Sequence, residues 1–196
     1  MDQLLNNNSS VLIIGGYGNL GRSIVNQLIK KNWHIFIIGH NQLENNSTLT
    51  NGKNIDTFFI NTIFTHSKQS LKQEIELLYK AIDTFFLEKK ILGFNAILNC
   101  AGGFDMCNIK SIDFILNGQE LIEKNYLSVL LTANLSSKYL LKNSLILITG
   151  AAKAFKESCS DMLLYQASKT AAHSVGLSLK DSKELPEGAC VITILP

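Results

Sequence analysis

Short, continuous apolar runs alternate along the chain with longer segments in which apolar residues recur every three or four positions. The runs are typical of strands covered on both faces; they span residues 11–14, 33–38, 96–103, 144–150 and 189–196, with a weaker candidate at 56–60. The helical spacing occurs in residues 20–30, 70–86, 118–141 and 165–179. This alternation favours the α/β class, in which a doubly wound parallel sheet carries helices on both faces.

The pattern also indicates a single domain. Residues 1–10 are polar and rich in Asn, which predicts a flexible N-terminal tail. Residues 11–196 contain neither an internal repeat nor a low-complexity linker, so we expect them to form one domain.

Composition narrows the class of partner. The chain is 46% hydrophobic and 17% charged with a net charge of +2, so neither a nucleic acid nor a membrane surface is expected as a partner. The N-terminus does not resemble a signal peptide, and no apolar run is long enough to span a bilayer. The four cysteines lack metal-ligand spacing, and Cys100 and Cys190 lie in runs predicted to be buried. We therefore expect a cytoplasmic protein with reduced thiols and no metal site.

Glycines are concentrated where the first predicted strand meets the first predicted helix. Gly16, Gly18 and Gly21 fit the pattern GxGxxG, and Gly15, Gly18 and Gly21 give the alternative GxxGxxG. Such glycines permit a tight turn, a close approach of a diphosphate to the backbone, and close helix packing. The alternative is a glycine-rich turn without a ligand. The residues predicted to contact a dinucleotide here are Gly15, Gly16, Tyr17, Gly18, Asn19, Leu20 and Gly21.

The end of the second strand bears on the choice of coenzyme. An acidic residue there would hold the adenosine ribose of NADH, but the chain has Gly39, His40 and Asn41 instead. No carboxylate repels a 2′-phosphate, and His40 and Asn41 are possible donors to one, unless His40 is only a solvated loop residue. We therefore expect either NADH or NADPH as coenzyme, with these three residues on its adenosine side.

Tyr165 and Lys169 form the first candidate catalytic pair. They lie four positions apart in YQASK and thus on one face of a helix. An ammonium near a phenol should lower the pKa of the tyrosine, making it a usable proton donor near neutral pH, and the same lysine is placed to hold a nicotinamide ribose. The alternative is an ordinary exposed helix pair.

Taken together, these motifs resemble the short-chain dehydrogenase/reductase family, which implies a Rossmann-like fold from residue 11 to residue 196. GGYGNLG is similar to the family's glycine motif, and NCAG at 99–102 to its NAG motif, which places Ala101, Gly102 and Gly103 beside the coenzyme. Asn125 stands 40 residues before Tyr165, where the family has an active-site asparagine. Ala152 occupies the position of the family's serine.

Ala152 points to one branch of the family. An alanine cannot hydrogen-bond to a substrate oxygen, so ordinary carbonyl reduction loses a main contribution. The dihydropteridine reductase branch also has alanine here, and the chain resembles it in NAILNCAGGF, GAAKA, YQASK and LPEGACVITILP. The resemblance implies NAD(P)H-dependent reduction of a quinonoid dihydropteridine, a pterin, with Tyr165 as proton donor and Asn125 holding a water or backbone group in a proton path. Phe104 and Ala152 would line the pterin site beside Tyr165, although Phe104 is equally suited to core packing.

Two other readings stay open. One is a reductase for another activated substrate such as a quinone, and the other is a catalytically idle NAD(P)-binding dimer. The second is motivated by the family's segment beyond the position of Pro196, which completes the nicotinamide pocket and has no counterpart in this sequence. The resemblance also implies a homodimer through the helices at 118–141 and 165–179. The apolar residues that would form its interface, or else face the sheet, are Leu127, Leu131, Leu135, Ala171 and Val175.

Overall fold

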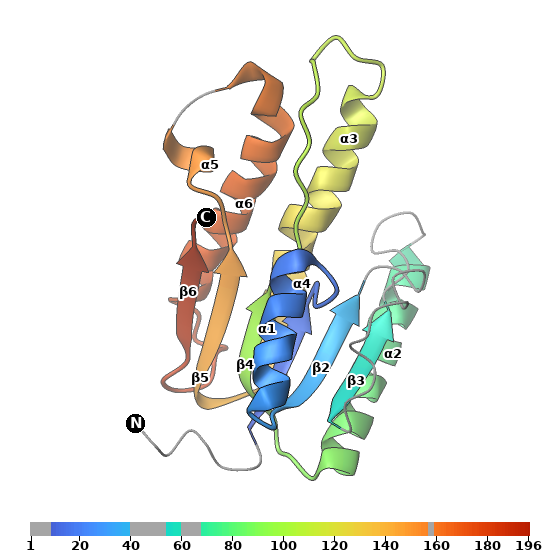
Figure 1. The fold of residues 1–196 in the computed structure, drawn as a ribbon, viewed down its shortest axis with the longest axis vertical. Coiled ribbons are helices and arrows are strands. Elements are labelled where there is room, and N and C mark those ends of the chain that lie inside the picture. Colours follow the sequence, from blue (N-terminus) through green and yellow to red (C-terminus); the bar gives the residue numbers. More distant parts are fainter. Residues whose placement is uncertain (1–8, 40–53, 60–67, 157–158) are drawn as a thin grey trace.

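Six parallel strands form one sheet in the computed structural model, which describes residues 9–39, 54–59, 68–156 and 159–196. The strand order is β3-β2-β1-β4-β5-β6 (Figure 1). Each neighbouring pair is parallel, so the carboxyl ends of all six strands meet at one edge. The strands are β1 (Ser10–Ile14), β2 (His34–Gly39), β3 (Ile55–Phe59), β4 (Phe94–Asn99), β5 (Leu140–Thr149) and β6 (Cys190–Ile194).

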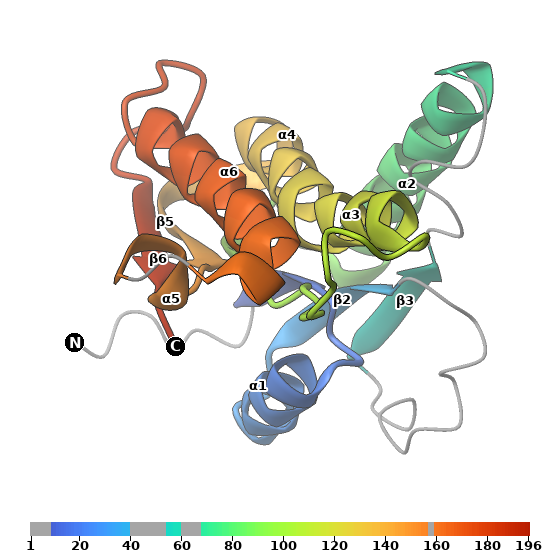
Figure 2. The same ribbon diagram turned by 90° about the horizontal axis from the view of Figure 1, so that it is seen from above.

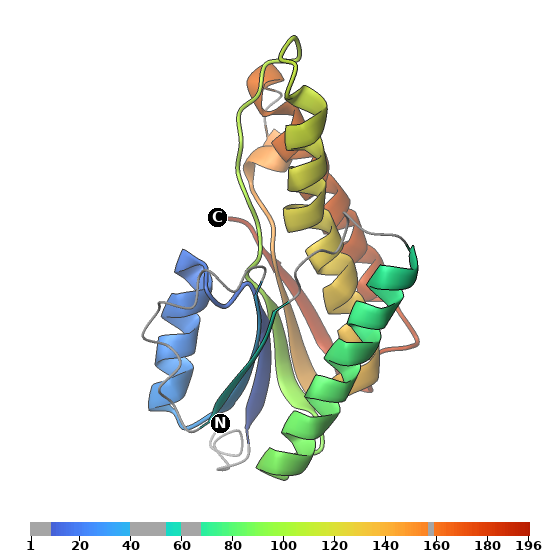
Figure 3. The same cartoon turned by 90° about the vertical axis from the view of Figure 1, so that its right-hand side faces the viewer.

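Helices cover both faces of this sheet, as predicted. Seen from above, α2 (Lys68–Lys89), α4 (Ser128–Tyr139) and α6 (Leu163–Leu179) lie on one face, and α1 (Asn19–Lys30) lies on the other (Figure 2). The helix α3 (Phe114–Leu121) runs into α4 through a π-helical turn, η4 (Ile122–Leu127). The segment after β4 and the helix α3 project beyond the carboxyl ends of the strands (Figure 3). The short α5 (Lys153–Lys156) and the 3₁₀ turn η5 (Ser160–Met162) precede α6.

Alternate residues of the strands build two cores. Leu12, Phe36 and Ile97 face the three-helix layer, and Val11, Ile35 and Leu98 face α1. The period of two along each strand therefore sends successive side chains into opposite layers. On its other face the sheet is covered less completely, because α1 does not reach β6 (Figure 2) and Ile192 of that strand is 44% exposed. Cys190 in the same strand is also exposed, so the predicted burial of this cysteine is wrong.

The element boundaries differ from the predicted ones at two places. The helical pattern at 118–141 begins earlier, at Phe114, and it ends at Tyr139, because Leu140 already pairs with Phe94 in the sheet. Strand β1 begins at Ser10, which is fully buried, so the last residue of the predicted tail belongs to the sheet. Residues 1–8 of that tail lie outside the described residues.

None of the helices in residues 9–39, 54–59, 68–156 and 159–196 combines the length and the apolarity that a membrane crossing requires.

Candidate functional site

The glycine turn after β1 is shaped by close backbone contacts inside the protein. Gly15 has a φ of +79°, and a Cβ there would lie 2.6 Å from the backbone nitrogen of Ala101. A Cβ on Gly16 would lie 2.7 Å from Cγ2 of Ile37, and one on Gly21 would overlap the carbonyl oxygen of Gly15. Packing within the chain therefore explains why these three positions carry no side chain.

Gly18 differs from the other three glycines. A Cβ there would meet only the Gly15 carbonyl oxygen, at 3.4 Å, which is an ordinary contact distance. Gly18 is the exposed N-cap of α1; no side chain caps the helix, and no acidic residue stands in its first turn. The positive end of the helix is thus open, with a bare backbone beside it, and these groups fit a diphosphate.

The aromatic residues near this turn belong to its support. Tyr17 is 4% exposed, its hydroxyl lies 2.9 Å from Oγ1 of Thr57, and its ring stacks on Phe59 with centroids 5.6 Å apart. The Tyr17 side chain therefore points into the core, which leaves its backbone for any coenzyme contact. A Cβ on Gly39 would lie 3.0 Å from both rings, so the space of a side chain at position 39 is filled. His40 and Asn41 lie outside the described residues.

The loop after β4 joins this turn to the second half of the site. Asn99 is 1% exposed, and its Nδ2 atom donates to Thr132 Oγ1 at 2.9 Å. Ala101 abuts Gly15, as described above. A Cβ on Gly102 would lie 3.0 Å from Oδ1 of Asn125 and 3.1 Å from Nζ of Lys169. The structure thus brings Asn125 and Lys169 to one end of the predicted coenzyme loop.

Asn125 lies in the π-helical turn η4, and such turns are frequent at functional sites. Its side-chain amide pairs with the backbone of Gly103: Oδ1 accepts from the N–H at 2.9 Å, and Nδ2 donates to the carbonyl at 3.0 Å. Nδ2 also donates to Oγ of Ser168, which itself donates to the carbonyl of Tyr165. The Asn125 side chain therefore ties the loop to α6 and acts as a structural clamp.

Lys169 is almost fully buried on α6. Its Nζ atom donates to the carbonyl of Thr149 at 2.9 Å, and burial lowers its pKa to about 8. Burial raises the pKa of Tyr165, so the expected lowering of that pKa by the ammonium is wrong for this structure. At neutral pH Tyr165 is a phenol that can donate a proton.

Phe104 contacts Tyr165 edge to face, with ring centroids 5.0 Å apart. Phe104 is 59% exposed, so the alternative of ordinary core packing does not hold for this ring. The pair offers an apolar ring edge and a hydroxyl side by side.

The end of β5 offers few free donors. The N–H of Gly150 donates to Ile194, that of Ala151 to Nε2 of His173, and that of Ala152 to Pro196. With an alanine at 152, neither a hydroxyl nor one of these three backbone N–H groups is available to polarise a substrate. Sequence reasoning missed His173 and Ser168; the signal for His173 was its position four residues after Lys169, on the same helix face.

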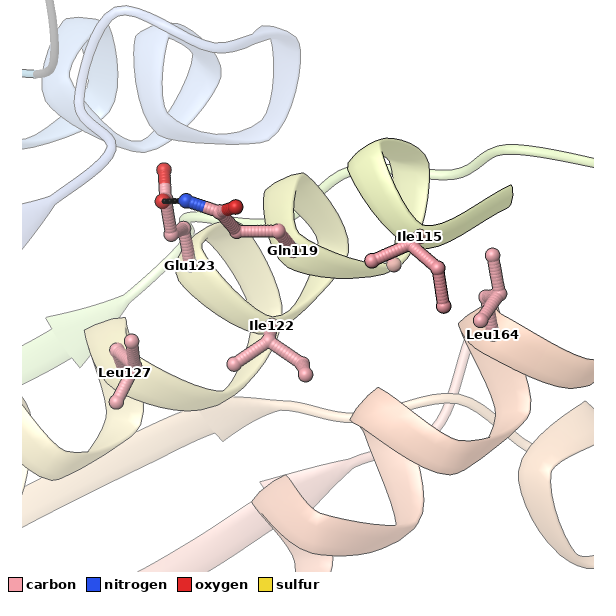
Figure 4. A pocket seen from close by; sticks show the side chains of 7 residues that line it. Ile115, Gln119, Ile122, Glu123, Leu127 and Leu164 are labelled. Atoms are coloured by element: carbon pink, nitrogen blue, oxygen red, sulfur yellow. Dashed lines mark hydrogen bonds between the residues drawn. The ribbon is translucent and has the colours of Figure 1, made fainter. Parts of the chain in front are cut away.

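The structure places the five residues considered for a dimer contact differently from one another. Leu131 and Leu135 are buried in the core beneath α4, and Val175 packs against that core. Ala171 is half-buried on α6. Leu127 lines a largely apolar groove of about 360 Å³ between α3, η4 and α6, with Ile115, Gly118, Ile122 and Leu164 (Figure 4). Gln119 and Glu123, joined by a hydrogen bond, form its polar side.

Solved structures of other proteins have the same fold as this chain. A dehydrogenase/reductase from Sinorhizobium meliloti is similar with a TM-score of 0.74 at 16% identity, over 100% of this chain and 76% of that one. A short chain dehydrogenase from Burkholderia cenocepacia, solved with NADP, has a TM-score of 0.73 at 19% identity, over 98% and 74% of the two chains. A short chain dehydrogenase family protein from Francisella tularensis has a TM-score of 0.72 at 21% identity, over 96% and 69%.

The solved structures show only the fold, whereas a match to a protein-family model also shows the family. The model for short chain dehydrogenases matches residues 9–195, which is nearly the whole chain. It spans both the glycine turn and the helix with Tyr165 and Lys169. The chain therefore belongs to the short-chain dehydrogenase family of NAD(P)-dependent oxidoreductases.

Proposed function

We propose that the protein reduces a substrate that is already a strong electrophile, and that this substrate is a quinonoid dihydropteridine, which becomes a tetrahydropteridine. The observation that carries the proposal is the lack of a polarising donor at residues 150–152, where a hydroxyl is absent and all three N–H groups are bonded within the protein. An ordinary ketone needs such a donor to stabilise its developing negative charge. A quinonoid pterin ring, by contrast, accepts a hydride without one.

The chain's own residues divide the work of holding the coenzyme. Gly18 and the open start of α1 would take the diphosphate, and Lys169 would take the nicotinamide ribose. The bound coenzyme supplies the hydride. NADH and NADPH are both compatible with Gly39, and the NADP bound by the Burkholderia cenocepacia relative supports the second.

Tyr165 supplies the proton in this proposal. Its raised pKa keeps the hydroxyl protonated at neutral pH, so the phenol can donate or relay a proton to the ring nitrogen that gains negative charge. Phe104 offers its exposed ring for packing against the pterin. Asn125 fixes the loop that carries both Gly103 and Phe104.

The test is a substrate panel with a matched variant. Wild-type protein should oxidise NADH or NADPH with a quinonoid dihydropteridine and show little turnover with aldehydes, ketones or quinones. Ala152→Ser restores a hydroxyl, so it should raise kcat/KM for ketones at least about tenfold while leaving the pterin rate nearly unchanged. A preference of the wild type for ketones would refute the proposal, and a preference for quinones would replace its substrate. Binding of coenzyme without turnover of any substrate would favour the alternative of a catalytically idle NAD(P)-binding protein.

We also infer a homodimer through the groove of Figure 4. Ile122 and Ile115 are 47% and 75% exposed on this surface, next to Leu164 of α6. Ile122→Glu should turn a dimer into a monomer in sedimentation velocity runs, whereas Leu92→Glu, at an equally apolar but distant exposed site, should not. A monomeric wild type would reject the inference.

A further inference from the structure

The face of α6 that carries Tyr165 and Lys169 continues one turn further to His173. The three residues are spaced by four positions, so their side chains lie along one side of the helix. His173 is 3% exposed, and its Nε2 atom accepts a hydrogen bond from the N–H of Ala151 at 3.0 Å. Because Nε2 is the acceptor, the neutral ring carries its proton on Nδ1. The hydrogen bond to Ala151 therefore exists only while the ring is neutral.

The lack of a side chain at Gly150 leaves room for this ring. A Cβ at position 150 would overlap Nε2 of His173 and would lie 2.7 Å from its Cδ2 atom. One turn earlier on α6, Lys169 donates to the carbonyl of Thr149. Successive turns of α6 thus hold Thr149 and Ala151, and the next residue is Ala152.

The electrical surroundings keep the ring neutral. Burial and the positive charge of Lys169 both lower the pKa of His173, burial being the larger cause. The groups next to it at the end of β5, Gly150 and Ala151, carry no charge, and neither does Leu195 beside Gly150. A proton on Nε2 would set two N–H groups against each other and would break the bond to Ala151.

We propose that His173 is a positioning residue that fixes the turn from Ala151 to Ala152 relative to the Tyr165 hydroxyl, and that it releases this turn when it takes up a proton. The inference rests on the proposed function for the identity of the substrate that the turn faces. It assigns to a buried histidine the placement of the residue that stands where the family has its serine. A turn displaced by about an ångström is enough to lower turnover about 100-fold.

Kinetics across pH test this role with three variants. In the wild type, kcat/KM should decline on the acid side as the ring of His173 takes up a proton. His173→Gln keeps an acceptor oxygen that does not titrate, so it should retain kcat/KM within about threefold at neutral pH and should not show this decline. His173→Leu removes the acceptor and should lower kcat/KM about 10–100-fold at every pH, with coenzyme affinity little changed. His34→Gln is the matched control, because burial also lowers the pKa of His34. His34 is the first residue of β2, so it lies at the amino-terminal ends of the strands, away from Ala151. If the His173 variants behave like the His34 control, the role is overturned.

An NMR experiment separates this inference from the proposed substrate. In ¹⁵N-labelled protein, the amide signals of Ala151 and Ala152 should shift together as the ring of His173 titrates, and His173→Gln should abolish that shift. If the wild type reduces no pterin while these amides still follow the ring, the substrate is wrong and the positioning role stands. Amides that do not respond to the ring overturn the role whatever the substrate.

Discussion

The glycine turn after β1 and the inner face of α6 meet at the loop after β4, and they are built in opposite ways. At the turn, side chains are missing because backbone atoms approach one another, as Gly15 approaches Ala101. On α6, side chains are present, buried and bonded to backbone: Lys169 holds Thr149, and His173 holds Ala151. One region is therefore damaged by an added carbon atom, and the other by a lost polar atom.

The largest effect should come from removing one oxygen on α6. Tyr165→Phe keeps the ring that packs on Phe104 but loses the proton donor, so kcat should fall about 10²–10⁴-fold with coenzyme affinity retained. Stopped-flow or steady-state oxidation of the coenzyme measures this. Tyr79→Phe is the control, because its hydroxyl donates to the side chain of Asn134 on α4, and it should keep full activity. Equal activity of the two variants would remove Tyr165 from the reaction.

Adding one carbon at the glycine turn should separate folding from binding. Gly21→Ala places a methyl group on the carbonyl oxygen of Gly15, so the free energy of unfolding should fall by about 3 kcal/mol or more. Urea unfolding followed by circular dichroism gives this value. A fall below about 0.5 kcal/mol would mean that the backbone there is not packed as described.

Gly18→Asp should give the opposite result to Gly21→Ala. Asp is a favoured N-cap, so the stability should stay the same or rise by a few tenths of a kcal/mol. Its charge would stand where the diphosphate binds, which should weaken coenzyme binding about 100-fold, or about 2.7 kcal/mol. Gly18→Asn, of the same size without the charge, is the matched control in a fluorescence titration. Unchanged affinity in Gly18→Asp would place the diphosphate elsewhere.

The same contrast explains what the sequence could predict. The glycine turn follows from local spacing, because a strand, a tight turn and a helix leave their marks within a dozen residues. The order of strands and helices follows from periodicity for the same reason. The bonds of Asn125 to Gly103 and of His173 to Ala151 join residues 22 positions apart, and such pairings depend on how α6 and η4 pack against the sheet. The sequence predicts the wrong direction for the pKa shift of Tyr165, because the pattern shows only the neighbouring ammonium, whereas burial raises this pKa.

Removing the clamp at Asn125 should have a moderate effect on stability and on the loop. Asn125→Leu leaves the N–H and carbonyl of Gly103 without partners, which should cost about 1–3 kcal/mol. Because Phe104 is the next residue, KM for the substrate should rise more than kcat falls. Asn134→Leu, at an exposed hydrogen bond of α4, is the control for the loss of an amide. Identical kinetics in both variants would show that the clamp does not reach the substrate.

The last prediction concerns the pH dependence that the buried ammonium of Lys169 gives to stability. Burial lowers its pKa to about 8 from the 10.5 of an exposed lysine, so between these two values the unfolded chain binds a proton that the folded protein lacks. The free energy of unfolding of the coenzyme-free protein should therefore rise with pH across this window, by at most about 1.4 kcal/mol per pH unit. Below pH 8 both states carry the proton, and the contribution of Lys169 is constant. Lys169→Met should flatten the rise, as measured by urea unfolding at several pH values, whereas Lys142→Met at an exposed surface pair should not. If stability still rises with pH in Lys169→Met, another group causes the rise. The pKa of Lys169 would then not be lowered by burial.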